Sequence, residues 1–291
     1  MKALIFGANG QDGHYLVASC RQKGYDVIAV SRNGDCLHGD VADYVCVEQF
    51  IKKHQPDLIF HLAARSSTSH EAIFENHETI GSGTINILES VKKWSPGSKV
   101  FITGSGLQFE NRLQPISERD PFAYSNPYVT VRNYSVGLAR YYRSLGIKTY
   151  VGYLFHHESP LRGERHVSQK IARAVRSIAD GTHEKIVIGD LSVKKEWTFA
   201  GDVVEGILLL VNQDSVFEAT IGSGIGYTIA DWLAECFKAI DRDWRDFVVE
   251  ELGYRPEYNV LISDPTTINS LGWHPETSFS QLADIMMHRQ K

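Results

Sequence analysis

Two side chains, Tyr128 and Arg132, have the types and spacing needed to move a proton to or from a substrate oxygen. The stretch "PYVTVRNYS", which starts at Pro127, places Arg132 four residues after Tyr128, so that on a helix both share one face. A neighbouring cation favours the ionised form of a phenol, which can then serve as acid or base. We therefore predict that Tyr128 and Arg132 are catalytic; the alternative is a packed tyrosine beside a surface arginine.

A glycine-rich turn follows the first apolar run of the chain. "GANGQDG" comes directly after "KALIF" and leads into a segment with helical periodicity. Such a turn lets backbone amides and the positive end of a helix approach a diphosphate. The alternative is a turn that only lets strand and helix pack closely. The predicted cofactor-binding residues of the turn are Gly7, Asn9, Gly10, Gln11, Asp12 and Gly13.

The end of the next apolar run, "VIAVSRN", bears on the choice of cofactor. A carboxylate there would bind the ribose hydroxyl of NAD, whereas a cation would accept the additional phosphate of NADP. The chain has Ser31 and Arg32 at this point. We therefore expect NADP rather than NAD, with Arg32 as a cofactor-binding residue; the alternative is a solvated surface arginine.

The elements that must position these residues alternate between short apolar runs and helical segments. This alternation requires parallel strands joined by crossover helices, and it predicts an α/β fold with a doubly wound parallel sheet, the Rossmann fold. We expect an NADP-binding domain over residues 1–157 and a smaller C-terminal α/β substrate-binding lobe over residues 158–291, with an interleaved boundary and a cleft between them. The region 185–189, "KIVIG", predicts a strand of the lobe.

Composition excludes several classes of protein. The chain of 291 residues has a net charge of −5, which argues against nucleic acid as a partner. No apolar run is long enough to span a membrane, and we expect a cytoplasmic protein. The four cysteines and the twelve histidines show no metal-ligand spacing, so we expect no metal site.

Longer motifs carry a resemblance to a known family. "GANGQDGHYL", "YLFHHESPLRGERHVSQKIARAV" and "GDLSVKKEW" resemble the GDP-mannose 4,6-dehydratases of the extended short-chain dehydrogenase/reductase superfamily, the NAD-dependent epimerase/dehydratase family. The layout is also similar to that of the GDP-4-keto-6-deoxy-mannose reductases. The resemblance implies a catalytic role for Ser105, at the end of "KVFITGS", beside Tyr128 and Arg132. It also implies a GDP-sugar substrate and further cofactor contacts at Asp40, Val41, Ala63 and Ala64. It implies substrate contacts at His156, Val167, Lys170, Lys195 and Arg255.

The chain departs from the family pattern at positions that matter for the reaction. Arg132 replaces a lysine, and Leu107 replaces the glutamate that serves the dehydratases as a base. Leucine cannot accept a proton, whereas oxidation or reduction at C4 needs only the tyrosine, the serine and the cofactor. We therefore expect a nucleotide-sugar oxidoreductase that acts at C4, as a 4-keto reductase or a 4-dehydrogenase. A 4,6-dehydratase or epimerase, and a non-catalytic nucleotide-binding protein, are the alternatives.

Three further departures lie in the expected substrate site, where His156 replaces an asparagine, Lys195 an arginine and Tyr258 a glutamate. The segment between Arg32 and "HGDVAD" is also shorter than the insertion with which the dehydratases join their tetramer. From the resemblance we expect a homodimer formed through the helices over residues 84–94 and 128–144.

Overall fold

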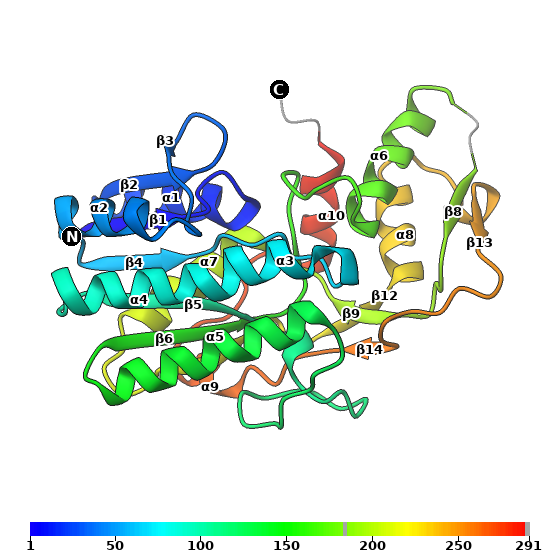
Figure 1. The fold of residues 1–291 in the computed structure, drawn as a ribbon. Helices are drawn as coiled ribbons and strands as arrows, with labels where there is room; N and C mark the ends of the chain where they lie inside the picture. Colours follow the sequence, from blue (N-terminus) through cyan, green and yellow to red (C-terminus); the bar gives the residue numbers. More distant parts are fainter. Residues whose placement is uncertain (183–184, 289–291) are drawn as a thin grey trace.

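The computed structural model describes residues 1–182 and 185–288 and is built around a seven-stranded parallel sheet (Figure 1). Its strands are β1 (Lys2–Phe6), β2 (Asp26–Ser31), β3 (Leu37–His38), β4 (Leu58–His61), β5 (Lys99–Ser105), β6 (Lys148–Leu154) and β11 (Glu218–Ile221). They lie in the order β11-β6-β5-β4-β1-β2-β3. The chain builds outward from β1 to β3 and then returns to β4 on the other side of β1, which confirms the predicted doubly wound fold.

Helices cover both faces of this sheet (Figure 1). One face packs against α1 (Gln11–Gln22) and α7 (Ala200–Val211), and the other against α2 (Tyr44–His54), α4 (Gly83–Trp94) and α5 (Pro127–Ser144). Strand β1 shows how the sequence produces both cores. Leu4 and Phe6 join the cluster of the second face, whereas Ala3 and Ile5 join the cluster of the first, because side chains alternate along a strand.

The second half of the chain builds a smaller α/β region beside the sheet. Helices α6 (Val167–Ala179), α8 (Ile229–Lys238) and α10 (Phe279–Met287) contribute to a third hydrophobic cluster, in which the rings of Trp197 and Trp232 stack with centroids 4.5 Å apart. The remaining short elements are α3 (Ile73–Asn76), α9 (Thr266–Ser270), β7 (His157–Glu158), β8 (Ile186–Ile188), β9 (Lys194–Glu196), β10 (Thr198–Phe199), β12 (Gly226–Thr228), β13 (Val248–Glu250) and β14 (Val260–Leu261). Strand β8 confirms the prediction made for "KIVIG".

Two elements of the second half pack with the larger region. Strand β11 pairs with β6 at the edge of the seven-stranded sheet, and helix α7 packs on helix α1. The division at residues 157 and 158 stays a prediction, but the chain clearly returns to the sheet after that point. Over the described ranges, no helix is both long enough and apolar enough to cross a membrane.

Candidate active site

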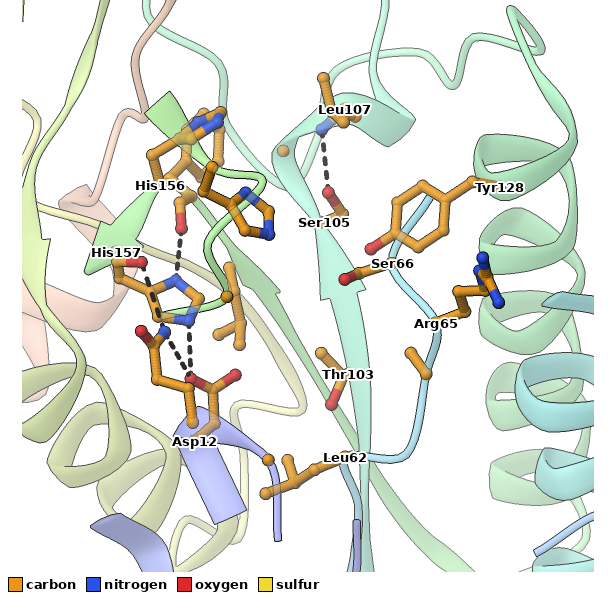
Figure 2. A pocket seen from close by; sticks show the side chains of 18 of the residues that line it. Asp12, Leu62, Arg65, Ser66, Thr103, Ser105, Leu107, Tyr128, His156 and His157 are labelled. Carbon is orange, nitrogen blue, oxygen red and sulfur yellow. Dashed lines mark hydrogen bonds and ion pairs between the residues drawn. The ribbon is translucent and has the colours of Figure 1, made fainter. Parts of the chain in front are cut away.

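A cavity of about 530 Å³ lies where the carboxyl ends of β1, β4, β5 and β6 meet the smaller region (Figure 2). The carboxyl edge beside the reversal point of a doubly wound sheet is where such folds bind ligands. The wall includes the glycine turn after β1, the end of β5 with Ser105, and the start of α5 with Tyr128. It also includes residues 161–163, 165–166 and 257–258 from the second half, so segments from both halves of the chain line the cavity.

The glycine turn has a backbone that larger residues could not adopt. Gly7 has φ +89°, and a Cβ atom there would lie 2.6 Å from the backbone nitrogen of Ala63. A Cβ atom on Gly13 would lie 2.3 Å from the carbonyl oxygen of Gly7. Helix α1 starts after Gly10, which has no side chain to cap the first amides. The turn therefore fits the diphosphate of a nicotinamide dinucleotide, because it leaves amides free and the approach open.

The predicted cofactor residues fall into two adjoining cavities. Gly7, Gly10, Gln11, Asp12, Gly13 and Ala64 line the large cavity. A second cavity of about 210 Å³ extends along β2 and shares the first glycines of the turn; its lining includes Asn9, Arg32, Asp40, Val41, Ala63 and Ala64. This second space fits the adenosine half of a dinucleotide. All eleven predicted residues therefore lie along one continuous trough.

Tyr128 lies in the first turn of α5, and the local sequence explains its placement. The side chain of Asn126 accepts a hydrogen bond from the amide of Val129 at 2.9 Å, and Pro127 occupies the first helical position. The ring of Tyr128 is 7% exposed and packs against Ala64. Its hydroxyl points into the cavity toward Ser105 and Ser66 (Figure 2). The end of the side chain can therefore reach a bound substrate.

Arg132 lies one helical turn further along α5 and is buried, with 3% exposure. Its Nη1 donates a hydrogen bond to the carbonyl oxygen of Thr103 at 2.6 Å, and its guanidinium carbon lies 5.2 Å from the ring centroid of Tyr128. Arg132 also lines the cavity. Within the described part of the chain, no carboxylate forms an ion pair with it. The site therefore contains an uncompensated positive charge beside the phenol.

Ser105 ends β5 and begins a short 3-10 turn (Gly106–Gln108). Its hydroxyl accepts a hydrogen bond from the amide of Leu107 at 3.3 Å, and its own amide donates to Oε1 of Gln108 at 2.7 Å. Gln108 is fully buried and also donates to Asn133 at 2.9 Å. Gln108 therefore holds the turn, and Leu107 presents an apolar side chain to the cavity.

The five predicted substrate residues are not gathered at one place. His156 lines the large cavity, on the opposite side from Tyr128 (Figure 2). Lys195 is buried 4.0 Å from Glu158, and Lys170 donates a hydrogen bond to Val187. Val167, Lys170, Lys195 and Arg255 do not line either cavity described above.

Four basic side chains of the cavity wall were missed by sequence reasoning: the arginines Arg65, Arg162 and Arg165, and His166, whose pKa burial and the charge of Arg162 lower to about 4. Arg162 stands at a fixed place in the quoted motif "HHESPLRGE", so that motif could have identified it. The other three occupy positions without such a signal, and the fold alone brings them together. Arg165, for example, donates a hydrogen bond to the carbonyl oxygen of Arg65 at 2.8 Å. This cationic wall could bind a second diphosphate.

A buried ion pair ties the glycine turn to the strand that follows β6. Nε2 of His157 lies 2.8 Å from Asp12, and Nδ1 bonds the carbonyl oxygen of Phe155 (Figure 2). Burial opposes both charges, but the charge and hydrogen bond of His157, with the charge of Arg162, lower the pKa of Asp12 to about 2. Burial likewise disfavours the imidazolium, but Asp12 outweighs it and raises the pKa of His157. The pair therefore links the glycine turn to the strand after β6, with Asp12 ionised and His157 more easily protonated than a free imidazole.

This pair should appear in the pH dependence of the free energy of unfolding. The contribution of Asp12 is complete above its ordinary pKa of 3.8 and is lost as pH falls through about 2. The contribution of His157 is complete below its ordinary pKa of 6.5 and is lost as pH rises through its raised value. We expect Asp12→Asn to lower the free energy of unfolding by about 3 kcal/mol near pH 5, measured by urea denaturation. The difference from the unmutated protein should shrink above pH 7.

The matched control for this prediction is Asp35→Asn, which removes an exposed carboxylate. It should change the free energy of unfolding by less than about 0.5 kcal/mol at any of these pH values. An Asp12→Asn protein that unfolds like the control would contradict a stabilising role for the pair.

Comparison with known proteins agrees with this geometry. The family model for GDP-mannose 4,6 dehydratase matches residues 4–286. GDP-mannose 4,6 dehydratase 2 of Caenorhabditis elegans is 30% identical, over 98% of this chain and 87% of its own, and GDP-mannose 4,6 dehydratase 2 of Arabidopsis thaliana is 29% identical, over 98% and 85%.

Solved structures share the fold at lower sequence identity. RMD from Pseudomonas aeruginosa, complexed with NADPH, has a TM-score of 0.86 at 18% identity, covering 98% of this chain and 97% of its own. UDP-glucose 4-epimerase from Thermus thermophilus, complexed with NAD, has a TM-score of 0.84 at 18% identity, covering 99% of this chain and 98% of its own. Since the match to the family extends over nearly the whole length, the chain belongs to the GDP-mannose 4,6-dehydratase family.

Proposed function

We propose that this protein is an NAD(P)-dependent nucleotide-sugar oxidoreductase that acts at C4 of a GDP-linked hexose, as a 4-keto reductase or a 4-dehydrogenase. The observation that carries the proposal is the arrangement of Tyr128, Ser105 and Arg132 around one end of the cavity, beside a trough that fits a dinucleotide. Family membership supports a GDP-sugar as substrate, since the matched relatives are named for GDP-mannose.

In the proposed reaction, the residues of this chain have distinct roles. The glycine turn and the trough hold the nicotinamide cofactor, which when bound supplies hydride exchange with the sugar carbon. The hydroxyl of Tyr128 gives a proton to the 4-oxygen during reduction and takes it back during oxidation. Ser105 offers a second hydroxyl to the same oxygen, and Arg132 places a positive charge beside the ring of Tyr128. The apolar side chains of Leu107 and Ala64 exclude water from the tyrosine.

The side chain of Leu107 separates this proposal from a dehydratase reaction. Elimination of water from C5 and C6 needs a base near C5, and the family's glutamate is replaced by a leucine that lines the cavity. Gln108, the neighbouring polar residue, is fully engaged in hydrogen bonds that hold the turn. Hydride exchange at C4 needs neither residue.

A two-part assay tests the proposal. Purified protein with NADPH and GDP-4-keto-6-deoxy-mannose should consume NADPH, followed by its near-ultraviolet absorbance, and mass spectrometry should show a product heavier by two hydrogens. In the second part, NADP⁺ and GDP-mannose are supplied instead. Loss of water from GDP-mannose without net change in NADP⁺ would favour a 4,6-dehydratase. Tight binding of both ligands without turnover would favour a nucleotide-binding protein without catalysis.

We also propose that the cofactor is NADP rather than NAD. Arg32 lines the second cavity and is about half exposed, and its Nη2 lies 3.6 Å from Glu75, a weak contact that a phosphate could replace. Arg32→Ala should raise the KM for NADPH about tenfold, because a charged hydrogen bond contributes roughly 1.5–3 kcal/mol. The KM for NADH should change less than about twofold.

Steady-state kinetics with both cofactors measures this effect. Arg21→Ala, which removes an exposed arginine near the end of α1, is the matched control and should leave both constants unchanged. If Arg32→Ala raises both KM values equally, Arg32 does not select the phosphate.

For the assembly we propose a homodimer formed through α4 and α5. Tyr134 and Tyr141 support it, since both are exposed and lie seven residues apart on one face of α5. We further propose a cytoplasmic location, in keeping with the four free cysteines.

A further inference from the structure

Two residues that both depart from the family pattern touch each other on the cavity wall. Nε2 of His156 and the hydroxyl of Tyr258 are 2.8 Å apart, although the residues are separated by 102 positions in the chain. Both line the large cavity, and Figure 2 places His156 on the side facing Ser105 and Tyr128. A second pair of groups able to move protons therefore faces the first across the substrate space.

The surroundings of His156 keep its imidazole neutral. Burial and the positive charges of Lys195 and Arg162 hold the pKa of His156 well below its usual range. In the neutral tautomer whose Nε2–H donates to the Tyr258 oxygen, the lone pair of Nδ1 is free to accept a proton. The diphosphate of a bound GDP-sugar would offset the neighbouring charges, which would make the imidazole more basic when substrate is present.

The other titratable groups of the cavity wall are occupied or poorly placed. Asp12 is committed to His157, whose two ring nitrogens are both hydrogen-bonded. Glu257 is exposed at the edge of the cavity and accepts hydrogen bonds from two neighbours. His166 is a second neutral imidazole of the wall, since burial and the charge of Arg162 lower its pKa to about 4, but among the described residues no side-chain hydrogen bond orients its ring as Tyr258 orients His156. Position 107, close to Ser105, holds a leucine rather than a carboxylate.

We propose that His156, positioned by Tyr258, is a second acid–base group that exchanges the proton on a carbon next to the C4 carbonyl of a bound GDP-linked 4-ketohexose. This rests on the proposed C4 chemistry, because the carbonyl makes the neighbouring C–H bond acidic. The imidazole takes the proton, the C–H electron pair forms a carbon–carbon double bond, and the carbonyl becomes an enolate oxygen. Return of the proton restores the ketone, so the step needs no oxidant or reductant.

Deuterium exchange isolates this step from hydride transfer. The protein is incubated in D₂O with GDP-4-keto-6-deoxy-mannose and NADP⁺, without reductant, and deuterium in the sugar is followed by mass spectrometry and proton NMR. Since the ketone is supplied, exchange does not depend on hydride transfer, and the NADPH assay reports the proposed function separately. We expect exchange at C3 or C5 well above the enzyme-free rate. Exchange no faster than without enzyme would overturn the proposal.

Two variants and a control identify the residue. His156→Gln keeps a hydrogen-bonding side chain for Tyr258 but cannot accept a proton, so exchange should fall about 100-fold further than the rate of NADPH oxidation does. Tyr258→Phe should lower the exchange rate with little change in the KM for the ketone, and combining it with His156→Gln should cause no further loss. His274→Gln, an exposed control, should behave as the unmutated protein. Exchange that survives His156→Gln would assign the step to another group.

Discussion

Replacing Tyr128 by phenylalanine is expected to lower kcat for NADPH oxidation by at least about 100-fold, because the variant lacks the group that exchanges a proton with the 4-oxygen. The change removes one oxygen atom from a ring that packs against Ala64, so the fold should be kept. The dissociation constant for NADPH, measured by fluorescence titration, should therefore change less than about threefold. A loss of turnover with intact cofactor binding is the expected signature of a catalytic hydroxyl.

The control for this experiment lies on the same helix. Tyr134→Phe removes a hydroxyl from an exposed tyrosine of α5 and should leave kcat unchanged. A Tyr128→Phe protein that still turns over at the rate of the Tyr134→Phe protein would refute the assignment. The proton would then have to come from another group of the cavity.

Local sequence was enough to predict the fold and one side of the site. Apolar runs alternating with helical segments led to the doubly wound sheet, because each pattern has a period that only one element satisfies. The glycine turn could also be predicted from the sequence, because a side chain at Gly7 or Gly13 would collide with backbone atoms. Arg132 was expected beside Tyr128 from helical spacing alone, and the two groups do contact each other.

The other side of the site depended on contacts between distant segments. His156, which follows β6, and Tyr258, which precedes β14, meet only because the fold brings these distant segments together, and no local pattern predicts such a contact. The burial of a side chain is likewise not evident from the sequence. Lys195 is expected as a substrate contact from the resemblance, yet it is 6% exposed, lies over the ring of Trp197 and lines neither of the two cavities. The sequence thus identified candidate residue types, whereas the tertiary structure determines which of their side chains line the same wall of the cavity.

The charge of Arg132, rather than the shape of its side chain, is what the site should require. A buried cation without a carboxylate partner normally costs stability, and such groups persist mainly where function needs them. Burial, together with Arg132, also lowers the pKa of the nearby His61 to about 3, so that histidine stays neutral and adds no second charge. The positive charge beside Tyr128 is therefore supplied by Arg132 itself.

We therefore expect opposite results from two substitutions at this position. Arg132→Met removes the charge and should lower kcat by about 100-fold or more, because the site loses the positive charge beside the group that moves the proton. Its free energy of unfolding should stay within about 1 kcal/mol of the unmutated protein, since relief of a buried charge offsets the hydrogen bond lost at Thr103. Arg132→Lys keeps the charge and should retain activity within about tenfold. Steady-state kinetics and urea denaturation of both variants measure these effects, and an Arg132→Lys protein as inactive as Arg132→Met would show that the guanidinium geometry, not its charge, is essential.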